Sequence, residues 1–345
     1  MRKLILAGIV LLLITIAKWP LLADNDKNDS RSETPFESTE GKETVKVAAA
    51  QILTDYNIGN NLQKITRSIR KADSCGCEII LFHEGCLTGY PDKEHIGQID
   101  FGEVREGEQT IRDLAKELRI AVLLGSSGKS RDGYSNYVLV INEEGKVLGR
   151  YLKAWRAGEP FYEAGSGPVI FQVAGVESTV IICHDLRYPA LARLGVAAGA
   201  RIVFIANNES GITAEHKLLG YRSMQIARAT ENRVYSVMSN SPADPDDIRR
   251  HNCSHGNSKI VNPSGVVLDE ARVFEQRLVT ATLDLTRATR STVLRTMGKN
   301  QSIKELYDTD YENPEYSKWI LNGLKLVRRL DGSDVPDYLK TGGEQ

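Results

Sequence analysis

The chain contains 345 residues, of which 41% are hydrophobic and 26% are charged, and its formal net charge is −1. This composition is typical of an ordinary globular protein with a large core, and the balanced charge argues against a nucleic-acid-binding surface or an acidic tail. Five cysteines are few for this length and odd in number, which argues against a disulfide framework. Cys75 and Cys77 are separated by one residue, too close for the usual zinc-ligand spacing, and we assign them a structural role.

The first 23 residues differ from the rest of the chain. A basic start is followed by an uncharged apolar run over residues 4–17, which suits the core of a signal peptide. The run is shorter than the roughly 20 residues that a spanning helix needs. We expect residues 1–23 to form a signal peptide or an N-terminal membrane anchor, with the folded part secreted, periplasmic or membrane-anchored outside the cytoplasm. Residues 24–43 are polar and predict a linker.

Strand-like and helix-like segments alternate from residue 44 to about residue 315. Apolar residues at helical spacing predict helices over 57–74, 108–119, 187–199 and 214–231. Apolar runs predict strands over 45–53, 78–84, 120–127, 201–207, 233–240 and 278–285, and hairpins over 134–153, 167–185 and 257–271. These elements indicate a single α/β domain with helices outside and sheets inside. The tail, residues 316–345, carries a helical pattern and is expected to dock on this domain or on a partner subunit.

Three reactive side chains stand where predicted strands end: Glu84, Lys153 and Cys183. A charged residue at such a position is often only the solvated end of a strand. Strand ends in α/β folds meet at one edge of the sheet, however, so side chains that are far apart in the sequence can converge there. The sequence therefore predicts a site built from these three residues.

These residue types suit nucleophilic catalysis by a thiol. A thiol reacts as its thiolate, so Cys183 needs a base or a nearby cation. Glu84 can accept the thiol proton, and Lys153 can stabilise the thiolate. Lys153 and the backbone N–H of His184 can then hold the oxyanion of a tetrahedral intermediate. Attack on an amide-type carbon releases ammonia or an amine and leaves a thioester, which water activated by Glu84 hydrolyses.

Two other arrangements fit the sequence less well. A Cys–His dyad could use His83 or His184, but these residues adjoin the proposed site residues in the sequence, and neighbours on a strand point to opposite faces. The alternating His251, Cys253 and His255 could bind zinc or copper from one face of an extended segment. A polar loop that contains a buried cysteine explains these three residues better, and we expect no metal site.

The sequence blocks around the three residues resemble the carbon–nitrogen hydrolase (nitrilase) superfamily over about residues 45–290. FHEGCLTGYP is similar to the family's glutamate block, RYLKAW to its lysine block, and VIICHDLRYPALARL followed by GARIVFIANN to its nucleophile block. The resemblance implies a triad of Glu84, Lys153 and Cys183. It also implies a four-layer α-β-β-α sandwich that usually dimerises and uses no metal or organic cofactor.

The resemblance further implies residues around the triad. A second catalytic glutamate is expected between the lysine and the cysteine; Glu159 is our assignment and Glu163 is the alternative. Arg187 resembles an arginine of amidases and carbamoylases, where a guanidinium can hold a substrate carboxylate as a bidentate pair. A local cap or salt bridge is the other role for this arginine. The remaining candidates for substrate binding are His184, Tyr90 and Asn207.

The expected function is hydrolysis of a linear amide or N-carbamoyl bond in a small substrate, one that bears a carboxylate if Arg187 binds it. A nitrilase or an acyltransferase with the same triad is the alternative. A non-catalytic binding module is less well supported, because all three triad residues are present. The expected partners are the small substrate and a second copy of the chain in a homodimer or higher oligomer, with no nucleic acid. Residues 4–17 would mediate any membrane attachment.

Overall fold

The computed structural model describes residues 42–209, 211–297, 314–333 and 335. The predicted signal peptide or anchor, and nearly all of the predicted linker, lie outside these residues. Within the described ranges, no helix combines the length and the apolar character that crossing a membrane requires.

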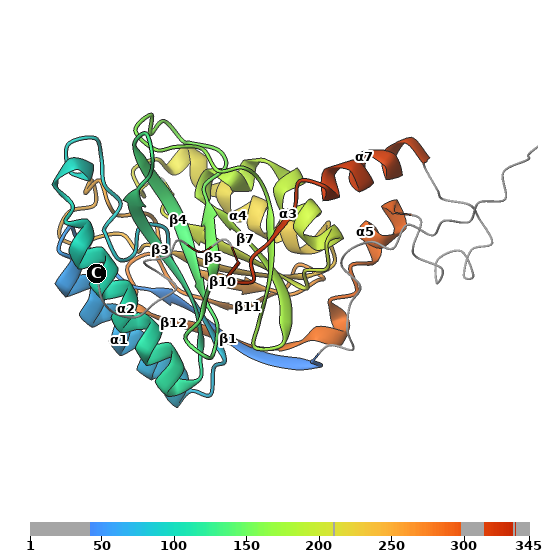
Figure 1. Ribbon diagram of the computed structural model, residues 1–345, viewed down its shortest axis with the longest axis horizontal. Helices are drawn as coiled ribbons and strands as arrows, with labels where there is room; N and C mark the ends of the chain where they lie inside the picture. The colour runs from blue at the N-terminus through green and yellow to red at the C-terminus, as the bar shows by residue number, and fades with distance from the viewer. Residues whose placement is uncertain (1–41, 210, 298–313, 334, 336–345) are drawn as a thin grey trace, which may run out of the picture. The chain divides into compact units, whose positions relative to one another are not determined.

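Two β-sheets form the inner layers of the fold (Figure 1). In the first sheet the order is β12-β1-β2-β3-β4-β5; β1, β2 and β3 run parallel, and the other pairs are antiparallel. Its strands are β1 (Thr44–Gln51), β2 (Ile79–Phe82), β3 (Ala121–Lys129), β4 (Tyr134–Ile141), β5 (Val147–Leu152) and β12 (Arg277–Asp284). Two helices, α1 (Ile58–Ser74) and α2 (Phe101–Leu118), cover its outer face.

The second sheet has the order β11-β10-β9-β8-β7-β6-β13, with β7, β8 and β9 parallel. Its strands are β6 (Val169–Val173), β7 (Val176–Ile182), β8 (Ile202–Asn207), β9 (Tyr235–Asn240), β10 (Lys259–Val261), β11 (Val267–Glu270) and β13 (Arg328–Arg329). The helix α3 (Pro189–Ala197) contacts β7, and α4 (Glu215–Thr230) contacts β9. These helices cover the side of the second sheet that faces away from the first.

Because side chains alternate along the strands, they contribute to two hydrophobic cores, one on each face of the first sheet. Val47 and Ala49 of β1 lie in the core between the sheets, whereas Ala48 and Ala50 lie in the core beneath α1 and α2. Both faces of this strand are therefore buried, which explains why its sequence is a continuous apolar run. The layers confirm the predicted α-β-β-α sandwich (Figure 1).

One predicted helix is longer than its sequence pattern indicates. The segment expected over 108–119 begins at Phe101, because Asp100 caps the helix by accepting a hydrogen bond from the Gly102 N–H at 2.7 Å. Phe101 and Val104 are buried in its first turns. Gly102 and Gly107 lower helix propensity and obscure this part of the pattern; burial and the cap outweigh that cost.

The segments after β12 pack along the second sheet. The helix α7 (Pro314–Leu324) contacts α3 and α5 (Ser291–Thr296), and β13 pairs in parallel with β6. Three short 3₁₀ helices complete the described elements: η1 (Ile96–Gln98), η2 (Cys183–Arg187) and η3 (Leu285–Arg287). Of these, η2 matters most for the site, because it begins at the predicted nucleophile.

Candidate active site

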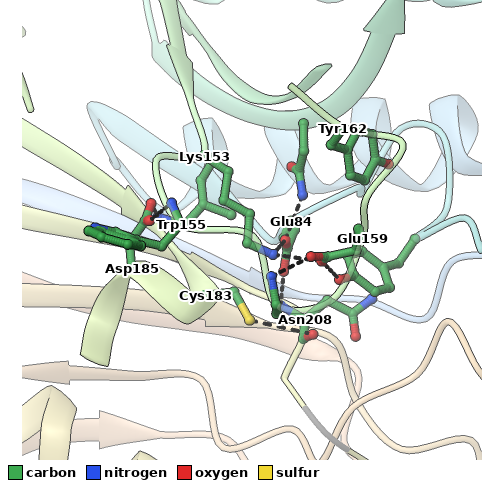
Figure 2. A network of polar contacts seen from close by, with 12 residues as sticks. Glu84, Lys153, Trp155, Glu159, Tyr162, Cys183, Asp185 and Asn208 are labelled. Carbon is green, nitrogen blue, oxygen red and sulfur yellow. Dashed lines mark hydrogen bonds and ion pairs between the residues drawn. The ribbon is translucent and has the colours of Figure 1, made fainter. Parts of the chain in front are cut away.

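The structure brings Glu84, Lys153 and Cys183 together at the ends of three strands. Lys153 directly follows β5, Cys183 directly follows β7, and Glu84 lies two residues after β2. Figure 2 shows the side chains of Lys153 and Glu159 and the backbone of Asn208 around Glu84, with Cys183 beside Asn208. The first and second sheets therefore both contribute to one cluster.

The carboxylate of Glu84 is fully buried and accepts three hydrogen bonds. Its Oε1 accepts from Lys153 Nζ at 2.7 Å and from Asn136 Nδ2 at 2.7 Å. Its Oε2 accepts from the backbone N–H of Asn208 at 3.0 Å. Burial raises the pKa of Glu84 above the usual carboxyl value, and the Lys153 ammonium limits the rise. This arrangement fixes the carboxylate in place and keeps it basic.

The Lys153 ammonium bridges two carboxylates. Besides Glu84, it donates to Glu159 Oε1 at 2.9 Å, and Glu159 also accepts from the Tyr90 hydroxyl and the Ala157 N–H. Burial disfavours the charged form of Lys153, but Glu84, with Cys183 and Glu159, outweighs burial and holds the lysine pKa well above its usual value. Burial likewise opposes ionisation of Glu159, yet Lys153 lowers the pKa of that carboxyl.

Of the two glutamates considered for the position between lysine and cysteine, Glu159 is the one that reaches Lys153. Glu163 instead accepts a hydrogen bond from the backbone N–H of Asp132 at 2.8 Å, away from the cluster. The sequence spacing alone left both open. The loop between β5 and β6 decides between them, because it folds Glu159 back over the lysine.

Cys183 has a left-handed backbone with φ of 44°, which is unusual for a residue other than glycine. Such a conformation costs about 1–3 kcal/mol and persists only where its surroundings enforce it. Here it forms the sharp turn from β7 into η2, and Sγ lies 3.7 Å from the Asn208 carbonyl oxygen. Burial, with Glu84 nearby, raises the pKa of the thiol well above its usual value. The resting cysteine is therefore a thiol.

Asp185 ties the cysteine turn to the lysine loop. Its buried carboxylate accepts from the Ile182 N–H at 3.1 Å and the Tyr151 hydroxyl at 2.7 Å. It also accepts from the Trp155 N–H at 2.8 Å. These donors come from the residue before Cys183 and from both sides of Lys153. The sequence analysis missed Asp185, although an acid just beyond a buried run was a signal that could have found it.

A cavity of about 590 Å³ opens beside the cysteine. The side chains that matter for its chemistry are Tyr90, Glu159, Cys183, His184, Glu209 and Arg249. Two of the predicted substrate-binding residues, Tyr90 and His184, therefore line it. The volume is within the range of about 300–1,000 Å³ that is usual for small-molecule sites.

The other two predicted substrate-binding residues lie elsewhere. Arg187 is exposed and is not among the residues that line the cavity, but its guanidinium lies 5.2 Å from the centre of the ring of Tyr221, which does line it. Asn207 is buried, and its Nδ2 donates to Glu209 Oε1 at 3.1 Å. Asn207 thus contacts a cavity residue rather than the cavity itself.

The histidines of the alternative arrangements have partners of their own. Both ring nitrogens of His83 lie at hydrogen-bond distance from backbone carbonyls, those of Glu84 at 2.9 Å and Ile52 at 3.1 Å, and burial lowers its pKa to about 4. His255 Nε2 lies 3.4 Å from Glu209 Oε2. Among the described residues, no three or more His, Cys, Asp or Glu side chains are arranged to hold a metal ion.

Glu209 is a second residue that the sequence analysis missed. It is buried in the cavity wall, and burial, with Glu84 nearby, raises its pKa to about 8. In the sequence it lies in NNESG, which is typical of a solvated turn.

The comparison with family models matches residues 46–291 to the carbon-nitrogen hydrolase family. The chain belongs to this family. It is a carbon–nitrogen hydrolase, which confirms the predicted family and enzyme class.

This carbon–nitrogen hydrolase is 29% identical to 2-oxoglutaramate amidase of Bacillus subtilis, over 65% of this chain and 85% of that protein. It is 26% identical to N-carbamoylputrescine amidase of Arabidopsis thaliana, over 72% of this chain and 89% of that protein. An amidase structure from Nesterenkonia sp. superposes with a TM-score of 0.63 at 22% identity, over 71% of this chain and 92% of that one. The structural likeness supports the fold.

Proposed function

We propose that this carbon–nitrogen hydrolase cleaves a linear amide or N-carbamoyl bond of a small substrate through a cysteinyl thioester. Cys183 is the nucleophile, Glu84 the general base and Lys153 the cation that stabilises the oxyanion. The observation that carries the proposal is the buried Glu84–Lys153 pair, with Oε1 and Nζ 2.7 Å apart, beside a cysteine in a left-handed turn. The amidase and N-carbamoylputrescine amidase activities of its relatives support the class of bond.

The first half of the reaction forms the thioester. Cys183 Sγ attacks the carbonyl carbon while the thiol proton passes to Glu84, since the raised thiol pKa keeps the resting cysteine protonated. Lys153 and the backbone N–H of His184 stabilise the negative charge that develops on the carbonyl oxygen. When the intermediate collapses, the C–N bond breaks and the leaving nitrogen takes the proton from Glu84.

The second half hydrolyses the thioester. Glu84 takes a proton from a water molecule as the water oxygen attacks the thioester carbon. The C–S bond then breaks, the acid leaves, and the proton on Glu84 returns to Cys183. Through both halves Glu159 keeps the Lys153 ammonium in position by the 2.9 Å ion pair.

A substrate carboxylate remains part of the proposal, with a different arginine as its partner. Arg187 is exposed outside the cavity lining, whereas Arg249 lines the cavity with its side chain exposed to solvent. A guanidinium is the favoured partner for a carboxylate because its donors match both oxygens. We therefore assign a substrate carboxylate, where one is present, to Arg249.

An ammonia-release screen across amides, N-carbamoyl amino acids and nitriles tests the proposal, run beside Cys183→Ala. We expect release from an amide or N-carbamoyl compound, and none from the variant. Mass spectrometry of the denatured enzyme with a slow substrate should find an acyl adduct on the Cys183 peptide. Substantial turnover by Cys183→Ala, or an adduct on Cys86 or Cys253, contradicts the mechanism.

Two alternative activities use the same triad, and the same screen, extended by an assay with hydroxylamine, distinguishes them from amide hydrolysis. A preference for nitriles over the matched amides identifies a nitrilase. Acyl transfer from substrate to added hydroxylamine, at a rate above that of hydrolysis, identifies an acyltransferase. The homodimer and the location outside the cytoplasm stay predictions, and gel filtration and fractionation of the producing cells test them.

A further inference from the structure

A second cavity, of about 520 Å³, lies at an edge of the sandwich away from the cysteine. Strands β4 and β5 of the first sheet supply one part of its wall, and the segment that contains β13 supplies another. None of Glu84, Lys153 and Cys183 lines it. The proposed reaction therefore leaves this cavity unexplained.

The charged side chains that line this cavity are all positive. Lys129, Arg131, Arg150 and Arg328 line it, and no aspartate or glutamate does. Arg150 pairs with Glu108 at 3.0 Å. The other three cations make no ion pair with any residue in the described ranges; Lys129 approaches the Phe101 ring at 5.7 Å. A concave surface lined by cations of one sign concentrates anions.

Two buried polar atoms of the cavity residues point to the same ligand class. Ser130 Oγ and Arg328 Nε are buried and have no hydrogen-bond partner among the described residues. Buried polar groups of this kind are rare in folded proteins and call for a partner. An anion with several oxygen atoms can accept from both a hydroxyl and a guanidinium N–H.

The rest of the wall is apolar. Val147 and Leu152 come from β5, and Leu330 and Val335 from the C-terminal segment. A purely ionic ligand leaves these side chains without a partner, whereas a ligand with a short hydrocarbon chain covers them. The cavity is therefore suited to an amphipathic anion.

The cavity shares its strands with the active site. Leu152 lines the cavity and the next residue is Lys153; Ser135 lines it and the next residue is Asn136, which binds Glu84. Successive side chains on a strand face opposite sides. Gly165, also in the wall, donates its N–H to the Lys153 carbonyl at 2.8 Å. A ligand in the cavity thus contacts the backbone that positions both partners of Glu84.

We propose that this cavity is an effector site for a small amphipathic anion, with a phosphate or carboxylate head and an alkyl chain, whose occupancy changes turnover at the cysteine. The effect on turnover rests on the proposed function, whereas the binding does not.

Calorimetry on the full chain with octyl phosphate tests the binding. We expect one molecule per chain, with affinity at least tenfold above that for inorganic phosphate or octanol. The double variant Arg131→Gln/Arg328→Gln should weaken binding at least tenfold. Arg131→Gln alone should weaken it at least threefold, and because Arg131 is exposed, its circular dichroism spectrum should match that of the wild type. Arg249→Gln, in the cysteine cavity, should leave the affinity within twofold.

Several results overturn the site. These are the absence of binding, equal affinity for inorganic phosphate, unchanged affinity in the two cavity variants, or loss of binding in Arg249→Gln. For the effect on turnover, saturating octyl phosphate should change kcat of the wild type at least twofold. The concentration that gives half of this change should rise at least threefold in Arg131→Gln. An unchanged kcat at full occupancy overturns the regulatory role and leaves the proposed reaction intact.

Discussion

Replacing Asp185 with asparagine tests whether one buried carboxylate positions both the nucleophile and the lysine. The two oxygens of Asp185 accept from two backbone N–H groups, of Ile182 and Trp155, and from the Tyr151 hydroxyl. Asparagine keeps the shape but has one acceptor oxygen and an NH₂ group. Whichever way the amide is turned, its NH₂ faces a backbone N–H, and one donor loses its partner.

The size of the expected effect follows from the loss of one backbone hydrogen bond. One buried N–H without a partner costs about 1–3 kcal/mol, which is a modest part of a typical stability of about 5–15 kcal/mol. The variant should therefore fold. Misplacement of catalytic groups by about 1 Å can lower turnover by a factor of roughly 100. Because the lost hydrogen bond belongs either to the cysteine turn or to the lysine loop, we expect kcat to fall about 10- to 100-fold, with a smaller change in KM.

The assay is steady-state ammonia release, with thermal unfolding measured on the same preparations. Tyr151→Phe is the matched control, since it removes one hydrogen bond to the same carboxylate but leaves both backbone N–H groups partnered. This control should retain most of the wild-type kcat. If Asp185→Asn is as stable as expected but turns over within twofold of the wild type, or if the control loses as much activity, Asp185 does not position the site.

The remaining predictions concern the charged groups of the site. Glu84→Gln should lower kcat by a factor of about 1,000 or more while the protein still unfolds cooperatively, because the amide cannot accept the thiol proton; near wild-type activity would remove Glu84 as the base. Burial raises the pKa of Glu84 above 4.5, and the carboxylate is the active form. Activity should therefore fall as the pH drops through a value above 4.5, whereas an acid limb at or below 4.5 would contradict that role. The pKa of Lys153 is held well above its usual value, so this lysine stays charged and activity should not fall at moderately alkaline pH. A fall in activity there that is absent in Lys153→Arg would contradict this. For a carboxylate-bearing substrate, Arg249→Gln should raise KM at least fivefold and Arg187→Gln less than twofold; the reverse order would return the carboxylate to Arg187.

The pattern of apolar runs predicted a single α/β domain with helices outside and sheets inside, together with the three strand ends, whereas the four layers of the sandwich were implied by the resemblance to the family. Several central strands, such as β1 and β2, bury both faces, so their sequences are mostly apolar and a polar or charged residue follows where the strand ends. Glu84 and Lys153 are such residues, and Cys183 is followed directly by His184 and Asp185. Strands of one sheet that run in the same direction end at the same edge, which accounts for the meeting of Glu84 and Lys153. Cys183 follows a strand of the other sheet, so its approach to them depends on how the two sheets stack.

The hydrogen-bond partners could not be predicted in the same way. Asn136 and Asn208 reach Glu84 from β4 and from the end of β8, strands that belong to different sheets. Which residues meet across two stacked sheets depends on their relative rotation and register, and hydrophobic patterning along one strand carries no information on either. The place of Arg187 could not be predicted for a related reason. The segment after Cys183 forms a short 3₁₀ helix, and the guanidinium of its last residue, Arg187, lies 5.2 Å from the centre of the ring of Tyr221, which lines the cavity.

Glu209 indicates how the site limits its own charge. Glu84 and Glu159 share the ammonium of Lys153, and the cations that favour the ionised form of Glu209 are Lys259 and Arg187. Burial, with Glu84 nearby, raises the pKa of Glu209 to about 8, and the group is therefore mainly protonated at neutral pH. Its Oε1 already accepts from Asn207 at 3.1 Å. Its other oxygen, Oε2, lies 3.4 Å from His255 Nε2. A neutral acid here does not compete with Glu84 for Lys153, which keeps the carboxylate beside the thiol as the ionised base.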